Sequence, residues 1–383
     1  MPIVANDEAS LSREEYQAYL IAEHSKIGRD LDKSTQSGGE SDPGAIDFAR
    51  VLVRRLNVVS EKLNNRDAAY RATLKKATEW TLALQSIQGR VAAELLAAAV
   101  GAVRRRDFPR ADGLIEEIGA TDPDIRIKCN ILRSDIAAEN LDYMKAFDLA
   151  QQAASCDPAN SAALVAFASI AHDLGQFDQA ISAYASALAN DIASHGEDHP
   201  NVAVLLNNLG VSYVATGAYE KAVVCYERAL SIDLLVFGED HPAVAIDRSN
   251  LAGASRMAGD FDKALACYDI SLRIDLKLLG YNHPQVATDL NNLGSAWHDM
   301  GEYGNAIECY AKALASDTKS FGETHPQVAT CLNNLGTAWR DCGEEKIARQ
   351  YFSEALKIFT EKLGPHHANT IIVQRNLVDL AAD

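Results

Sequence analysis

The chain has 383 residues with 53 acidic and 36 basic side chains, which gives a formal net charge of −17. This excess of acid argues against nucleic-acid binding, because contacts with phosphate groups need a basic surface. The sequence has no apolar run of the roughly 18 residues that a membrane-spanning helix needs, and its start lacks the order of a signal peptide. Seven cysteines without a pairing pattern indicate reduced thiols. We therefore expect a cytoplasmic protein with neither nucleic-acid nor membrane partners.

The N-terminal part of the chain falls into two segments of opposite charge. Residues 1–42 hold nine acidic and four basic side chains and end in a Gly- and Ser-rich stretch, which predicts a flexible acidic arm. Residues 43–91 hold nine basic and four acidic side chains, with apolar residues at roughly helical spacing. This pattern predicts one or two amphipathic helices. Three roles stay open for them: capping the first repeat, self-association, or docking of a partner.

A long repeat begins after residue 160. The dipeptide His-Pro recurs every 42 residues, and an alanine column and an aromatic column keep the same interval. The histidines are His199, His241, His283 and His325, the alanines Ala180, Ala222, Ala264, Ala306 and Ala348, and the aromatics Tyr184, Tyr226, Tyr268, Tyr310 and Phe352. Small residues at fixed positions allow two helices to approach closely, and the aromatic ring fills the space between them. Each repeat is therefore predicted to be a helical hairpin.

Shorter and terminal units complete the array. Residues 92–160 contain two degenerate 34-residue units, residues 161–370 contain five long units, and residues 371–383 contain a closing helix. A fixed long period indicates one supersecondary unit stacked on itself, so we predict an all-α fold. The expected architecture is a right-handed superhelical solenoid of helical hairpins, preceded by the N-terminal helical segment.

The columns of these hairpins resemble those of the tetratricopeptide repeat. The segment Leu206-Asn207-Asn208-Leu209-Gly210 and the loop sequence Gly-Glu-Asp-His-Pro are similar to the 42-residue form found in the kinesin-light-chain subgroup. The copy that contains Arg248, Ser249 and Ala252 departs from this pattern. The resemblance covers about half of the chain. It implies that the first helices of the hairpins line a concave groove, in which asparagines hold the main chain of a partner.

Asparagine pairs recur at the 42-residue interval inside the first helices. An amide has one acceptor and two donors, so it can bond both groups of an extended peptide backbone. The same side chains could instead bond between neighbouring repeats, and one asparagine of each pair could serve each role. An arginine in the groove favours an acidic partner, an argument that the neighbouring Asp299 and Asp341 weaken. The candidate groove residues are Asn207, Asn208, Asn250, Arg256, Asn291, Asn292, His298, Asn333, Asn334, Arg340, Arg375 and Asn376.

No residue pattern indicates catalysis, a metal or a cofactor. Equivalent histidines of successive repeats are separated by at least a helix-packing distance of roughly 8–10 Å, so they cannot converge on one metal ion. Each His-Pro histidine is expected to cap or bond its own loop. Cys225, Cys267 and Cys309 form another 42-residue column and are expected to be small buried hydrophobes. The glycines are never clustered as in a phosphate-binding loop, and we predict a protein that is not an enzyme.

Two functions fit these expectations. The first is a non-enzymatic scaffold or adaptor that binds a peptide segment of a partner protein in the concave groove. The second is a regulatory or sensing subunit that clamps a partner enzyme or is autoinhibited by its own N-terminal region. Residues 1–42 are long enough to reach at least the first repeats. Self-association through residues 43–91 is a further expectation, because their basic face could contact the acidic body of another copy.

Overall fold

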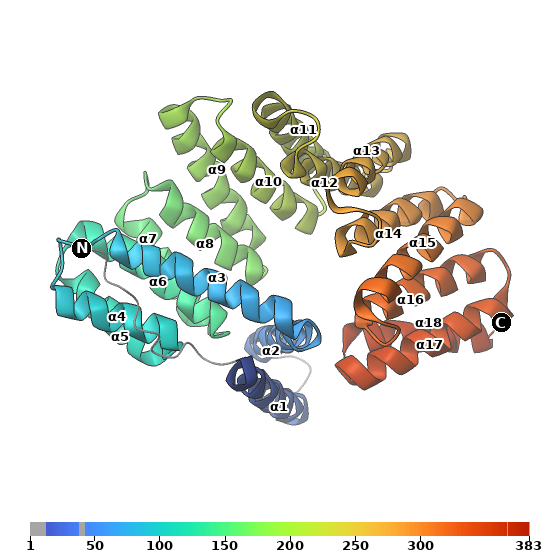
Figure 1. Ribbon diagram of the computed structural model, residues 1–383, viewed down its shortest axis with the longest axis horizontal. Coiled ribbons are helices and arrows are strands. Elements are labelled where there is room, and N and C mark those ends of the chain that lie inside the picture. Colours follow the sequence, from blue (N-terminus) through green and yellow to red (C-terminus); the bar gives the residue numbers. More distant parts are fainter. Residues whose placement is uncertain (1–12, 38–42, 366, 383) are drawn as a thin grey trace. The chain divides into compact units, whose positions relative to one another are not determined.

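The computed structural model describes residues 13–37, 43–365 and 367–382, and these residues form 18 α-helices without a strand (Figure 1). The chain divides into two compact units, residues 1–190 and residues 191–383, which we call unit 1 and unit 2. The protein is an all-α repeat solenoid in which consecutive helices pack in pairs. Within the described part of the chain, no helix is long and apolar enough to cross a lipid bilayer.

Unit 1 begins with three helices that precede the hairpins. Its helices are α1 (Arg13–Ser37), α2 (Pro43–Asn64), α3 (Arg66–Gln85), α4 (Ala93–Arg105), α5 (Phe108–Ala120), α6 (Pro123–Glu139), α7 (Tyr143–Cys156) and α8 (Ser161–Asp173), together with most of α9 (Phe177–His195). After these three helices, α4 packs against α5 and α6 packs against α7. The amphipathic helices expected over residues 43–91 are α2 and α3.

Unit 2 consists of regular hairpins and a closing helix. The helices are α10 (Pro200–Ala215), α11 (Tyr219–Phe237), α12 (Pro242–Met257), α13 (Phe261–Leu279), α14 (Pro284–Asp299), α15 (Tyr303–Phe321), α16 (Pro326–Asp341), α17 (Glu345–Leu363) and α18 (Ala368–Ala382). First helices have 16 residues and second helices 19, in agreement with the 42-residue period. The hairpins therefore follow one another as the sequence predicts.

The His-Pro motif starts each first helix of unit 2. The Nδ1 atom of His241 accepts a hydrogen bond from the backbone N–H of Ala243 at 3.2 Å, and His199, His283 and His325 do the same in their own helices. The ring of Phe237, at the end of the preceding helix, stacks on His241 with centroids 4.3 Å apart. The expected capping role is thus confirmed, because a side-chain acceptor satisfies an N–H group that lacks a partner within the helix.

Glycine in the first helix and an aromatic ring in the second set the close approach within a hairpin. A Cβ atom added to Gly210 would lie 2.6 Å from the ring of Tyr226, and one added to Gly294 would lie 2.8 Å from the ring of Tyr310. The alanines of the column that includes Ala222 are fully buried. These contacts confirm the packing role predicted for the small and aromatic columns.

Residues 13–37 form a helix, so the prediction of a flexible arm is wrong for this part of residues 1–42. Residues 1–12 and 38–42 lie outside the described residues. Tyr16, Leu20 and Ile27 of α1 are 1% exposed. They pack with α2, with Leu141 of the α6–α7 turn and with Tyr143 at the start of α7. Spacing of three to four residues places apolar side chains on one helical face. This buried face outweighs the acidic composition on which the prediction relied.

Candidate partner-binding face

The two asparagine columns lie on the first helices of unit 2. Both columns are half-buried, at the border between the core and the surface. Leu206 and Leu209, which flank the pair Asn207-Asn208, are 3% and 5% exposed and anchor this part of α10 in the core. We call the surface of α10, α12, α14, α16 and α18 that carries these asparagines the asparagine face.

Six of the eight asparagines are paired across repeats. Asn250 Nδ2 donates to Asn207 Oδ1 at 3.4 Å, Asn334 Nδ2 to Asn291 Oδ1 at 3.2 Å, and Asn376 Nδ2 to Asn333 Oδ1 at 3.0 Å. Each bond links the second asparagine of one repeat to the first asparagine of the repeat before it. The alternative that the sequence left open, bonding between neighbouring repeats, is therefore what these six side chains do.

Asn208 and Asn292 differ from the other asparagines. In the sequence, the positions 43 residues before Asn208 and Asn292 hold Val165 and Ser249, and neither of these side chains has an amide. Within the described part of the chain, neither asparagine side chain makes a hydrogen bond. Both amides are half-buried, with one acceptor and two donors left for a ligand. The copy that departs from the family pattern at Ser249 is thus the one that leaves Asn292 unpaired.

The paired asparagines also donate inward. Asn207 Nδ2 donates to Asp247 Oδ1 at 2.6 Å, and Asn291 Nδ2 donates to Cys331 Sγ at 3.1 Å. Asp247 is 1% exposed, and Cys331 is fully buried and donates to Asp317 Oδ2 at 3.4 Å. Sequence reasoning missed this polar layer beneath the asparagine face. The aspartates that recur every 42 residues in the second helices were the sequence signal that could have revealed this layer.

Three basic residues of the face are paired with acids, two of them with an acid of the next repeat and one with an acid of its own repeat. Arg256 Nη1 lies 2.6 Å from Asp299 Oδ2, and His298 Nε2 lies 2.9 Å from Asp341 Oδ2. Arg340 Nε donates to Asp341 Oδ1 at 2.7 Å. Such pairs reduce the positive potential that an acidic segment would meet.

Arg375 differs from these three residues. It is exposed and makes no ion pair with any other described residue. Among the predicted groove residues, it is therefore the cation whose charge stays available to a partner.

In unit 1 the corresponding face is covered by α3. Leu141 and Gly217 each have a positive φ in the turn that follows a first helix, and this shared feature aligns the two hairpins. In this alignment, Ile131 and Leu132 of α6 occupy the positions of Asn207 and Asn208 in α10. α3 lies along α6 (Figure 1). Residues of both helices line an open pocket of about 310 Å³. Its walls include Trp80 and Leu84 from α3 together with Ile131 and Leu132 from α6. Two apolar side chains thus replace the asparagines where a helix of the same chain covers the face.

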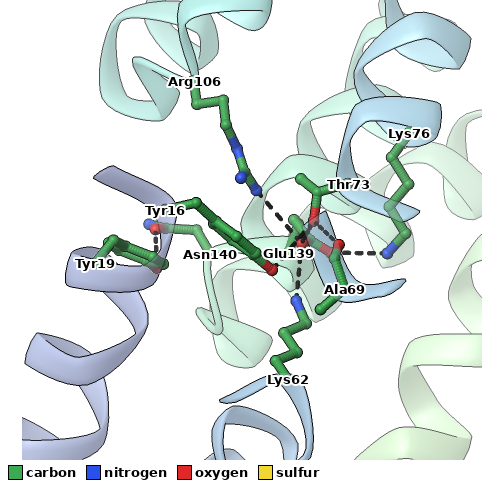
Figure 2. A network of polar contacts seen from close by, with 9 residues as sticks. All are labelled: Tyr16, Tyr19, Lys62, Ala69, Thr73, Lys76, Arg106, Glu139 and Asn140. Carbon is green, nitrogen blue, oxygen red and sulfur yellow. Dashed lines mark hydrogen bonds and ion pairs between the residues drawn. The ribbon is translucent and has the colours of Figure 1, made fainter. Parts of the chain in front are cut away.

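A buried carboxylate connects the N-terminal helices to the first hairpins of unit 1 (Figure 2). Glu139 at the end of α6 is 6% exposed, and its oxygens lie 2.8 Å from Lys62 Nζ of α2 and 2.9 Å from Lys76 Nζ of α3. Thr73 Oγ1 donates to the same carboxylate at 3.1 Å, and Arg106 Nη2 lies 3.6 Å from it. Burial raises the pKa of Glu139, but the two lysines outweigh this effect and hold it at about 2.

The cysteines and the metal-binding residue types add no further site. Cys225 and Cys267 are buried as predicted, whereas Cys309 is half-buried. Burial raises the pKa of each of these three thiols. The described residues contain no group of three or more His, Cys, Asp or Glu side chains placed to hold a metal ion. The asparagine face is therefore the candidate site that the geometry favours.

Models of the tetratricopeptide repeat match this sequence over residues 160–235, 203–268, 243–298, 290–341 and 328–369. No curated protein matches the chain. A tetratricopeptide repeat protein from Parabacteroides merdae is similar in structure, with a TM-score of 0.52 at 18% identity over 76% of this chain and 98% of that one. The apo form of RapI has a TM-score of 0.51 at 14% identity over 66% of this chain and 99% of that one. TPR-like repeats of a candidate kinesin light chain from Podosopora anserina have a TM-score of 0.49 at 20% identity over 53% of this chain and 97% of that one.

Proposed function

The chain belongs to the tetratricopeptide repeat family, and we propose that its unit 2 binds an extended segment of a partner protein along the asparagine face. Repeats of this family make the chain a protein–protein interaction scaffold. The single observation that supports the asparagine face as the binding surface is the pair of unpaired amides, Asn208 and Asn292. Half-buried amides that lack a partner among the described residues can form hydrogen bonds with a ligand without breaking existing ones.

The spacing of the two amides defines the length of the segment. Asn208 and Asn292 lie two repeats apart, and adjacent packed helices are separated by roughly 8–10 Å. The amides are therefore roughly 16–20 Å apart if successive first helices keep this separation. An extended chain advances about 3.3–3.6 Å per residue, so five or six residues span this distance. Arg375 beyond them offers an unpaired charge, which favours a segment with an acidic residue or a carboxylate at one end.

Capture from a cell lysate with quantitative mass spectrometry tests this proposal. The double variant Asn208→Ala and Asn292→Ala removes the two unpaired amides and leaves the inter-repeat bonds in place. We expect it to lose the partner that the wild-type protein captures, with an unchanged melting temperature. A matched control, Asn333→Ala, removes one side of the bond to Asn376 at 3.0 Å. It should lower the melting temperature and keep the partner, and equal capture by all three proteins would refute the proposal.

We infer a second function, regulation by the N-terminal helices, from the covered face of unit 1. α3 covers the face that corresponds to the asparagine face, and Glu139 fastens α2 and α3 to α6 through Lys62 and Lys76. Glu139→Gln leaves these cations without their counter-charge and should release α3. Regulation predicts that this variant captures more partner protein, or an additional one. Unchanged or reduced capture by a folded variant would make these helices a permanent part of unit 1.

A further inference from the structure

A column of buried aspartates runs through the second helices of unit 2. Asp233, Asp275 and Asp317 recur every 42 residues and are 6%, 6% and 4% exposed. Aspartate is almost never buried to this degree without a partner, because an ionised carboxylate loses its hydration. The partners of these aspartates come from the first helix of the next hairpin.

Two of the partners are themselves carboxyl groups. Asp247 of α12 is 1% exposed and within hydrogen-bonding reach of Asp233 of α11. Asp289 of α14 is fully buried and within hydrogen-bonding reach of Asp275 of α13. The Oδ2 atoms of Asp247 and Asp289 are buried and receive no hydrogen bond from another donor in the described residues. Since an ionised carboxylate can only accept, two ionised partners would leave these oxygens unsatisfied.

The surroundings of the pairs favour a neutral carboxyl group. Asp247 Oδ1 accepts from Asn207 of α10 at 2.6 Å, and Asp289 Oδ1 accepts from Gln285 of its own helix at 3.3 Å. Burial and the neighbouring aspartate raise the pKa of Asp247 to about 7 and that of Asp289 to about 8, and the amide donors oppose this only in part.

The other titratable groups near the pairs are few. His241, at the start of α12, faces Asp233 and favours its ionised form when the imidazole is protonated. The phenol of Tyr268 on α13 lies near Asp289. Among the described residues, no lysine or arginine lowers the pKa of Asp247 or Asp289. Neither pair therefore has a fixed positive charge to stabilise a second negative charge.

At Asp317, the third aspartate of the column, the buried carboxylate has a hydrogen-bond donor that is not a second carboxyl group. Cys331 stands where the other two repeats have Asp247 and Asp289, and its thiol donates to Asp317 Oδ2 at 3.4 Å. A thiol brings its own hydrogen, so this seam is satisfied without a shared proton. The contrast indicates that the two carboxyl pairs need one bound proton each.

We propose that the pairs Asp233–Asp247 and Asp275–Asp289 each hold one shared proton between neighbouring hairpins and act as a proton-linked switch in unit 2. Loss of the proton leaves two negative charges facing each other, at the α11–α12 seam and at the α13–α14 seam. The first pair also reaches the asparagine face, because Asp247 accepts from Asn207, which pairs with Asn250. Deprotonation therefore loosens the packing of the hairpins and the hydrogen bonds of the face together.

The sign of the pH dependence follows from linkage. A buried acid with a raised pKa binds more protons in the folded state than in the unfolded state, so stability falls as the pH rises through the window between the two values. For an unfolded aspartate near pH 4 and folded values of about 7 and 8, unit 2 loses stability between about pH 4 and pH 8. Each shared proton contributes about a tenfold rise in the unfolding constant per pH unit inside this window.

Urea unfolding of the full chain from pH 5 to pH 9 tests the proposal. In a Trp80→Phe background the two remaining tryptophans, Trp297 and Trp339, both report on unit 2. We expect the unfolding constant of unit 2 to rise up to about a hundredfold per pH unit where both pairs titrate. Asp247→Asn and Asp289→Asn each supply an amide donor without a charge, and each should remove about half of this slope.

The control variant is Asp262→Asn, which changes an exposed carboxylate on α13 and should keep the full slope. Two results would overturn the proposal. One is a wild-type unit 2 whose stability is flat or rises over this pH range. The other is the full wild-type pH slope in both single variants, since the shared protons cannot then be the groups that titrate.

Discussion

Gly294 allows us to test the packing that defines each hairpin. A Cβ atom at this position would lie 2.8 Å from Cε1 and 2.9 Å from Cδ1 of Tyr310, and 3.2 Å from Cβ of Cys309. The ring cannot easily move away, because Tyr310 is 4% exposed and its hydroxyl donates to Ser295 Oγ at 3.1 Å. Overpacking of a dense core costs about 1–3 kcal/mol. We expect Gly294→Ala to lower the free energy of unfolding by an amount in this range.

The matched control is Gly304→Ala in the first turn of α15. Gly304 is exposed, and a Cβ atom there would meet nothing within 4 Å. Its substitution should stabilise the protein by up to about 1 kcal/mol, because alanine loses less conformational freedom than glycine on entering a helix. Urea unfolding followed by circular dichroism measures both variants. In a Tyr310→Ala background, Gly294→Ala should no longer destabilise. Equal effects of the two glycine substitutions in the wild-type background would refute the packing argument.

Two further predictions concern the charged and capping groups. Glu139→Gln should destabilise unit 1 by about 1–3 kcal/mol, because it removes the negative charge that pairs with the partly exposed Lys62 and Lys76 and with the buried Arg106. Urea unfolding monitored by Trp80 fluorescence, in a Trp297→Phe and Trp339→Phe background, measures this loss. Since the pKa of Glu139 is held at about 2, the wild-type contribution is present above the unfolded value of roughly 4.3 and lost as the pH falls towards 2. A variant with the same acid sensitivity as wild type would contradict this assignment. His241→Ala should cost about 0.5–2 kcal/mol through loss of the N-cap bond to Ala243, and an unchanged melting temperature would argue against the capping role.

The period of the sequence was sufficient to predict the hairpins of unit 2. His241, Gly294 and Tyr310 each belong to a column in which one residue type has one local task, either a cap or a close contact. Because these caps and contacts form within one hairpin and recur with the sequence, they can be predicted without knowing how the hairpins stack. The helices of residues 43–91 could be predicted for the same reason, since their apolar spacing is local.

Interactions between repeats were harder to predict. The bond between Asn207 and Asn250 joins residues 43 apart and depends on the angle between two hairpins, which no local pattern specifies. Sequence reasoning named this bond only as one of two alternatives. The aspartate column of Asp233 and Asp275 was visible in the sequence, but aspartate on a helix is usually exposed, so its burial required the structure.

The N-terminal region shows a different limit. The composition of residues 1–42 predicts a flexible arm, whereas the positions of Tyr16 and Leu20 allow a helix with one buried face. Glu139 meets Lys62 and Lys76 over sequence separations of 77 and 63 residues. An ion pair over such a distance has no sequence signal, because each residue alone is an ordinary surface type.

The dissociation constant of the captured segment measures what the two unpaired amides contribute to binding. Once capture identifies the partner, isothermal titration calorimetry can compare its binding segment with wild type and with the Asn208→Ala and Asn292→Ala variant. Each amide can form two hydrogen bonds to the segment, and each bond contributes about 0.5–1.5 kcal/mol, so we expect at least about a thirtyfold loss of affinity. An unchanged dissociation constant for the folded double variant would show that the partner binds elsewhere on the chain.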